Sequence, residues 1–143
     1  MARFLIDTIF RWTGSKQPTS LMRLSDISEV TVLLDGDEPS VDEVAHVVGN
    51  FFAAKGIQLV MVKARQRRWI KVHRDTQVLL SLVPWKGFNL EYAVRRSRAA
   101  FKIGRCQFPG EPFDLVVSDP EGTRFSQPDV FRRMMEIIGN LQK

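Results

Sequence analysis

Short apolar runs alternate with amphipathic stretches from residue 30 to the end of the chain. The runs are rich in β-branched residues and are bounded by turn residues, which is typical of buried strands. They cover residues 30–34, 57–62, 77–83, 99–104 and 113–117. The second run is nearly continuous, which predicts a strand covered on both faces. The pattern therefore predicts about five strands in a mostly parallel sheet.

Three amphipathic stretches lie between or after these runs, with apolar residues three and four positions apart. Ser40 and Glu43 have the spacing of a capping box at the start of the first helix, and Gly56 ends it. Asn89 is the expected cap of the second helix, and the third begins near Ser126. A strand-helix-strand order predicts βαβ crossovers, hence a three-layer, Rossmann-like α/β sandwich.

Two segments do not fit the simple alternation. The last two runs are separated only by residues 105–112, whereas a parallel crossover usually takes about a dozen residues or more. We therefore expect the last two strands to be antiparallel or not adjacent, which places an antiparallel strand near the C-terminus. The basic segment 63–74 alternates weakly and is either a loop or an edge strand.

The start of the chain has its own pattern. Apolar residues on one side and charged residues at four-residue spacing on the other predict an amphipathic helix over residues 3–12. Residues 13–26 contain glycine, proline and hydroxyl residues, which is typical of a linker. We divide the chain into a helix with its linker (1–27) and one α/β domain (28–143). The apolar side of the helix predicts packing on its own domain, on a protein partner or second copy, or on a membrane surface.

Composition narrows the class of protein. A chain of 143 residues with 44% hydrophobic and 26% charged residues is typical of one globular domain. Its one cysteine, Cys106, excludes an internal disulfide and favours a reducing, cytoplasmic location. No segment approaches the ~20 apolar residues of a membrane span. The net charge of +5 suits an anionic partner, depending on how the charge is distributed.

The segment that follows Asn89 reads NLEYAVRRSRAAFKIGR, and FDLVVSDPEG comes shortly after it. These segments, with VTVLLDGDEPSVDEV nearer the start, resemble a family of small uncharacterised bacterial α/β proteins, in which a helix ending in Ser-x-Ala precedes a strand reading Phe-Lys-Val-Gly-Arg. Ser97, Ala99 and residues 101–105 occupy those places here. Where that family usually carries an aspartate near the end of its third strand, this chain has Ser81. The resemblance implies an α/β fold and no established activity. The helix-to-strand part is also similar, locally, to the N-terminal domain of heptosyltransferases.

Polar residues follow the first predicted strand. Asp35, Asp37 and Glu38 lie at its carboxyl end, where ligands bind in open α/β sheets. Asp35 and Asp37, with Ser81 on the third strand, are therefore our candidate ligand-binding residues. Carboxylates there suit Mg²⁺, but they equally suit a turn before a helix N-terminus. No G-x-G-x-x-G motif is present, and we predict neither a metal nor a cofactor.

Basic residues gather in two clusters, one around Trp69 and one between residues 95 and 105. The candidate anion-binding residues are Arg65, Arg67, Arg68, Arg95, Arg98, Lys102 and Arg105. Basic and aromatic residues interleaved in this way are a feature of nucleic-acid binding. That interpretation requires both clusters to share one face, and charge runs are more often solvated surface.

These patterns favour a binding or interaction module over an enzyme, since neither Cys106 nor His46 nor His73 has an evident catalytic partner. The alternative is an enzyme or receptor for a phosphorylated small molecule, with carboxylates and arginines converging at the strand ends. Nucleic-acid binding is the second alternative.

Overall fold

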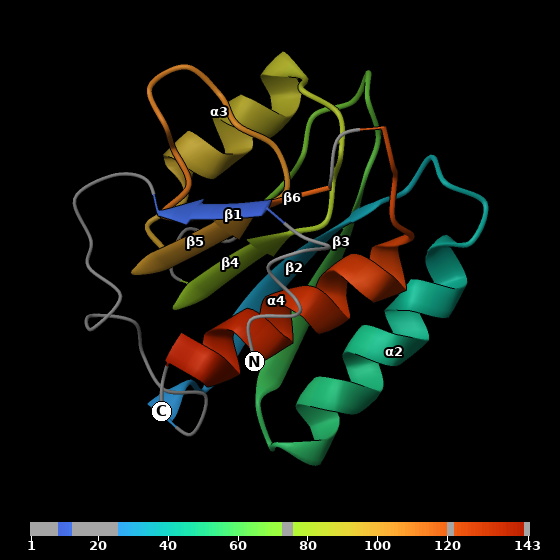
Figure 1. Ribbon diagram of the computed structural model, residues 1–143, viewed down its shortest axis with the longest axis vertical. Coiled ribbons are helices and arrows are strands. Elements are labelled where there is room, and N and C mark those ends of the chain that lie inside the picture. Colours follow the sequence, from blue (N-terminus) through green and yellow to red (C-terminus); the bar gives the residue numbers. More distant parts are fainter. Residues whose placement is uncertain (1–8, 13–25, 73–75, 120–121, 142–143) are drawn as a thin grey trace.

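The computed structural model describes residues 9–12, 26–72, 76–119 and 122–141. In chain order they form β1 (Ile9–Trp12), β2 (Glu29–Asp35), α2 (Val41–Ala54), β3 (Gln58–Ala64), β4 (Val78–Ser81), α3 (Phe88–Arg96), β5 (Phe101–Gly104), β6 (Leu115–Ser118) and α4 (Gln127–Leu141). The strands form one six-stranded sheet in the order β1-β6-β5-β4-β2-β3 (Figure 1). Strands β2 to β6 are parallel, and β1 is antiparallel to β6. The predicted α/β class is confirmed.

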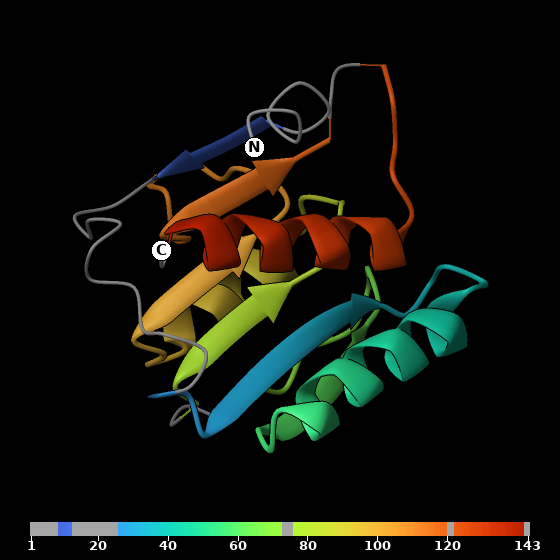
Figure 2. The same cartoon turned by 60° about the horizontal axis from the view of Figure 1, so that its bottom comes forward.

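Helices cover both faces of the sheet. The pair α2 and α4 lies on one face and α3 lies on the other (Figures 1 and 2). The alternation of side chains along β2 explains this arrangement, because Val30 and Val32 join the core under α2 and α4, while Leu33 joins the core under α3. Each fully buried aliphatic side chain of this kind contributes about 1.5–3 kcal/mol of transfer free energy. Two cores, one on each face, therefore hold the layers together.

The order of the parallel strands creates a switch point at the centre of the sheet. From β2 the chain crosses to β3 on one side and then to β4 on the other. In open α/β sheets, ligand crevices lie beyond the carboxyl ends of the strands at such a point. The ends of β2 and β4 are therefore where the fold places a site.

The pairing of β5 with β6 corrects the expectation for the last two strands. They are adjacent and parallel, with Ile103 opposite Leu115 and Gly104 opposite Val116. A four-residue strand is only about 13 Å long, and the ten-residue connection reaches about 33 Å when extended. The chain therefore returns to the start of the sheet without a crossover helix. The antiparallel strand of the sheet is β1, which pairs with β6, the last strand along the chain.

The helix expected over residues 3–12 is wrong for Ile9–Trp12, which form strand β1. Three β-branched or aromatic residues, Ile9, Phe10 and Trp12, favour a strand, and β6 would otherwise present an unpaired edge. Residues 3–8 and most of the expected linker lie outside the described residues. The predicted packing of this segment on its own domain, on a protein partner or on a membrane surface therefore stays a prediction.

Three smaller expectations are also corrected. Strand β3 is an edge strand and is only partly covered, with Met61 41% exposed. Ser40 precedes α2 but makes no side-chain capping bond, because its hydroxyl donates to Glu38 Oε1 at 2.6 Å. Gly87, not Asn89, occupies the N-cap of α3. The basic segment after β3 is a loop as far as residue 72.

Helix α4 forms as expected. Ser126 Oγ accepts the amide of Asp129 at 3.3 Å and so caps the helix. Apolar residues of α4, including Phe131 and Met134, are buried in the core that α4 shares with α2. Within the part of the chain that the structure describes, no helix has the length and apolar character needed to cross a membrane.

Candidate functional site

A cleft of about 980 Å³ opens at the carboxyl edge of the parallel strands. Its walls come from the loops after β2 and β3, from the segment between β4 and α3, and from the segment before α4. We call the loop after β3, residues 65–68, the arginine loop. The lining residues are Asp35, Asp37, Glu38, Arg65, Gln66, Arg67, Arg68, Trp85, Arg124, Phe125 and Ser126.

Asp35 ends β2 at the floor of the cleft and is 7% exposed. Its Oδ1 accepts hydrogen bonds from Trp85 Nε1 and from the amide of Asp37, both at 3.1 Å. Its Oδ2 accepts none from the described residues. The carboxylate therefore has one oxygen fixed by the protein and one available to a ligand.

The main chain of Asp35 is held by the side chain of Gln127, which is fully buried in the first turn of α4. The Asp35 amide donates to Gln127 Oε1 at 2.8 Å, and Gln127 Nε2 donates to the Asp35 carbonyl at 3.3 Å. A primary amide can donate and accept in this way at once. We call this pair of bonds the Gln127 clamp. It fixes the end of β2 relative to α4.

The arginine loop is held in place by two side chains from elsewhere in the chain. Asn89 Nδ2 donates to the carbonyls of Arg65 and Arg68, at 2.8 and 2.7 Å. Asp37 Oδ2 accepts the amide of Gln66 at 3.0 Å. These bonds satisfy main-chain groups that a free loop would leave to water, so the loop has a defined conformation before any ligand arrives.

Four arginines line the cleft, and they differ in whether a carboxylate lies close to them. Arg65 Nη1 lies 3.8 Å from Asp37 Oδ1. Arg67, Arg68 and Arg124 are exposed and form no ion pair with any carboxylate of the described residues. Three guanidinium groups around one cleft that no carboxylate of the described residues pairs favour the binding of an anion.

Ser81 does not join this cleft. The sheet register places it opposite Leu33, two residues before Asp35, and it is fully buried. Its Oγ accepts the amide of Val83 at 3.3 Å. The structure therefore brings Asp35 and Asp37 together and leaves Ser81 below the edge of the sheet.

The second basic cluster also lies outside the cleft. Arg95 bonds Glu91 Oε2 and the carbonyl of Pro109, and Lys102 Nζ donates to the carbonyl of Val94 at 2.7 Å. Arg98 is exposed and precedes β5, which places it toward the amino edge of the sheet. Of the candidate anion-binding residues, only the three from the arginine loop line the cleft.

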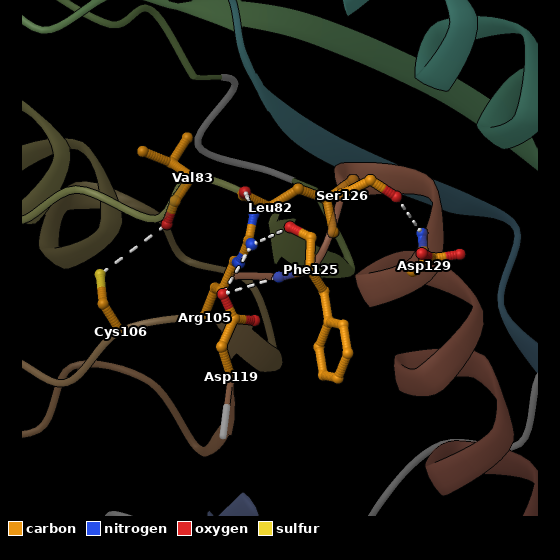
Figure 3. A network of polar contacts seen from close by, with 8 residues as sticks. All are labelled: Leu82, Val83, Arg105, Cys106, Asp119, Phe125, Ser126 and Asp129. Carbon is orange, nitrogen blue, oxygen red and sulfur yellow. Dashed lines mark hydrogen bonds and ion pairs between the residues drawn. The ribbon is translucent and has the colours of Figure 1, made fainter. Parts of the chain in front are cut away.

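Arg105 is the buried centre of a network at the carboxyl edge (Figure 3). Its side chain is 1% exposed, and its Nη2 bonds Asp119 Oδ2 at 2.9 Å and the carbonyl of Phe125 at 2.6 Å. Nη1 donates to the carbonyl of Leu82 at 3.1 Å. Arg105 therefore joins the ends of β4 and β6 to the segment before α4, and its guanidinium is engaged by the protein itself.

Cys106 lies beside this network and is 8% exposed. Its Sγ faces the carbonyls of Val83 and Trp85 at 3.8 and 3.7 Å. Burial raises the pKa of the Cys106 thiol to about 11, against the opposing effect of Lys86 and Arg105. The thiol is therefore protonated, and so a poor nucleophile, at neutral pH.

Sequence reasoning missed Arg124, Trp85, Gln127 and the true role of Asn89. Arg124 follows β6, the last strand along the chain, so the rule that ligands bind at the carboxyl ends of strands would have suggested it. No feature of the neighbouring sequence reveals the contacts of Gln127 and Asn89, because their partners are 92 and at least 21 residues away.

No group of three histidine, cysteine or acidic side chains suited to a metal ion occurs among the described residues. No family model, curated protein or solved structure matches the chain. The resemblances stated from the sequence therefore stay predictions.

Proposed function

We propose that this chain is a non-catalytic binding protein whose cleft at the strand ends holds a phosphorylated small molecule. The observation that carries the proposal is the placement of Arg67, Arg68 and Arg124 around one cleft without carboxylate partners among the described residues. Guanidinium groups match the geometry of phosphate oxygens and bind them through paired, charge-assisted hydrogen bonds.

The shape of the cleft supports a ligand larger than phosphate itself. Its volume of about 980 Å³ falls in the range of small-molecule sites. Asp35 and Glu38 line the same cleft as the arginines, and carboxylate oxygens accept hydrogen bonds from hydroxyl or amino groups. Trp85 and Phe125 add ring surface. The ligand we expect has a phosphate at one end and hydroxyl or amino groups at the other.

We limit the proposal to binding because two of the nucleophiles near the strand ends, Ser81 and Cys106, are not available to a ligand in the cleft. Ser81 is fully buried, and Cys106 is buried with a raised pKa. Neither belongs to the cleft lining. Ser126 does line the cleft, but its Oγ is engaged as the cap of α4, and the arginines and the fixed Asp35 provide recognition.

Calorimetric titration with a panel of sugar phosphates and nucleoside phosphates tests the proposal, with each dephosphorylated counterpart as its control. We expect at least one phosphorylated compound to bind and its counterpart not to. A ligand present at a hundred times its Kd stabilises the folded state by about 2.7 kcal/mol, so a rise in Tm confirms binding to the folded chain.

Arg124→Gln is the decisive variant, since Arg124 is exposed and contacts no other charge of the described residues. Losing one charge-assisted hydrogen bond costs about 1.5–3 kcal/mol, which is roughly a 10- to 100-fold weaker Kd. Arg132→Gln removes the same charge from the exposed side of α4 and should leave the Kd unchanged. Equal effects of the two variants, or equal binding of phosphorylated and dephosphorylated compounds, would refute the proposal.

A further inference from the structure

Three aromatic side chains gather on the outer surface of α3 and the loop after β3. Trp69 is 71% exposed, Phe88 73% and Tyr92 38%. Among residues 26–72, 76–119 and 122–139, only these three and Met61 are exposed large hydrophobic side chains. Exposed apolar groups that cluster in this way mark an interaction site. We call the three residues the aromatic surface.

The rings are arranged with their faces and edges in contact. Tyr92 lies at the centre, with the Trp69 ring edge-on at 5.5 Å and the Phe88 ring stacked at 6.1 Å between centroids. Arg96 lies over the Tyr92 ring at 5.4 Å and donates to its hydroxyl at 2.8 Å. The central ring is therefore fixed, while the two outer rings keep most of their surface open to solvent.

Cations border the aromatic surface on both sides. Two shallow hollows flank it, one of about 300 Å³ beside Arg67 and Arg68 and one of about 250 Å³ beside Lys71 and Arg96. No acidic residue lines either hollow. The surface thus combines flat exposed rings with positive charge.

We propose that the aromatic surface binds single-stranded nucleic acid. Unpaired bases stack on exposed rings whatever their sequence, and neighbouring Arg and Lys side chains neutralise the phosphates between them. A duplex keeps its bases stacked inside and cannot use the rings. An acidic protein segment would satisfy the cations but would not require two open ring faces, so the nucleic acid fits both features.

This site is separate from the proposed phosphate cleft, although Arg67 and Arg68 border both. Variants at these two arginines would not distinguish the sites. Trp69 and Phe88 line only the hollow beside the aromatic surface, and Arg124 lines only the cleft. Trp69→Ala and Arg124→Gln therefore report on one site each.

Fluorescence anisotropy with a labelled oligonucleotide tests the proposal. The probe is a mixed-sequence single strand of about 12 nucleotides without a terminal phosphate, so that the ligand class of the cleft is not offered. We expect binding at low salt, and we expect the logarithm of the association constant to fall linearly with the logarithm of the salt concentration. Trp69→Ala and Phe88→Ala should each weaken binding about tenfold, since each removes a stacking ring.

The matched controls use exposed residues elsewhere. Met61→Ala removes an exposed apolar side chain from β3 and should have no effect. Arg96→Gln should lower the salt slope by about 0.7, whereas Arg132→Gln on α4 should not. Circular dichroism checks that each variant keeps the wild-type fold and Tm.

Several results would overturn the proposal. They are no binding at about 20 mM salt, wild-type affinity in both Trp69→Ala and Phe88→Ala, or equal affinity for the duplex of the same sequence. Tighter binding of a polyglutamate peptide than of the oligonucleotide, with the same dependence on Trp69, would assign the surface to an acidic protein partner instead.

Discussion

Replacing Arg105 by methionine should destabilise the fold far more than replacing an exposed arginine. The Arg105 side chain is 1% exposed and bonds three segments through Leu82, Asp119 and Phe125. Methionine fills much of the same volume but donates nothing. Arg105→Met therefore leaves the Asp119 carboxylate without its cation and the two carbonyls without their donor.

The magnitude follows from burial and from the quality of the network. Removing one partner of a buried ion pair costs about 3–5 kcal/mol. Here the lower end applies, because the Asp119 side chain keeps 17% exposure. In addition, Arg105 Nε and Asp119 Oδ1 are buried and have no hydrogen-bond partner among the described residues, so the wild-type pair already carries a desolvation penalty. We expect a loss of about 3 kcal/mol.

Urea denaturation measures this loss. With an m-value of about 2 kcal/mol/M, the midpoint should fall by about 1.5 M. Arg132→Met is the control, since Arg132 bonds Asp129 on the surface and exposed pairs contribute about 0–1 kcal/mol. Asp119→Asn combined with Arg105→Met should cost less than the two single changes added together, because the unpaired charge is gone. A loss below about 1 kcal/mol for Arg105→Met, or simple additivity with Asp119→Asn, contradicts the reasoning.

Two further predictions concern Cys106 and Gly104. Burial raises the pKa of the Cys106 thiol from 9.0 to about 11, so at pH 8 the native chain should react with a disulfide reagent about 100-fold more slowly than the urea-unfolded chain. Equal reaction rates in the two states would show that the thiol is not buried. The raised pKa also makes stability depend on pH: the unfolded thiol loses its proton at a lower pH than the native one, so the free energy of unfolding should fall from about pH 9 to about pH 11. A Cβ on Gly104 would lie only 2.3–2.5 Å from three ring atoms of Phe113, so Gly104→Ala should cost about 1–3 kcal/mol in urea denaturation. Gly49→Ala in helix α2, where a Cβ meets nothing closer than 4.0 Å, should instead stabilise by about 0.5–1 kcal/mol; the same sign for both would refute the packing argument.

The elements that were predictable are those whose own residues determine them. Strand β2 is buried along nearly its whole length, and its run of β-branched and aliphatic residues identifies it without reference to the rest of the chain. Helix α4 carries its apolar stripe and its cap, Ser126, within one segment. The same local logic placed Asp35 and Asp37 at the carboxyl edge, because a residue that follows a buried parallel strand must lie there.

The elements that were missed depend on partners far along the chain. Residues Ile9–Trp12 have helical spacing in sequence but pair with β6, more than a hundred residues away. Asn89 has the sequence position of a helix cap, yet its side chain is used to hold the arginine loop. Ser81 was expected beside Asp35, and the strand register, which sequence does not reveal, places it two residues lower. Local propensity cannot include such contacts, which follow from the topology.

The Gln127 clamp also sets how the C-terminal part of the chain tolerates changes in length. A residue added between Gly122 and Arg124 leaves Phe125, Gln127 and the apolar stripe of α4 in phase with one another, so the loop absorbs the change. A residue added between Gln127 and Val130 would turn the stripe by about 100° relative to the side chain that grips β2. Helix α4 could then not keep both the Gln127 clamp and its contacts with the core. We therefore expect differences in length among homologous chains to be confined to the loop before Gln127.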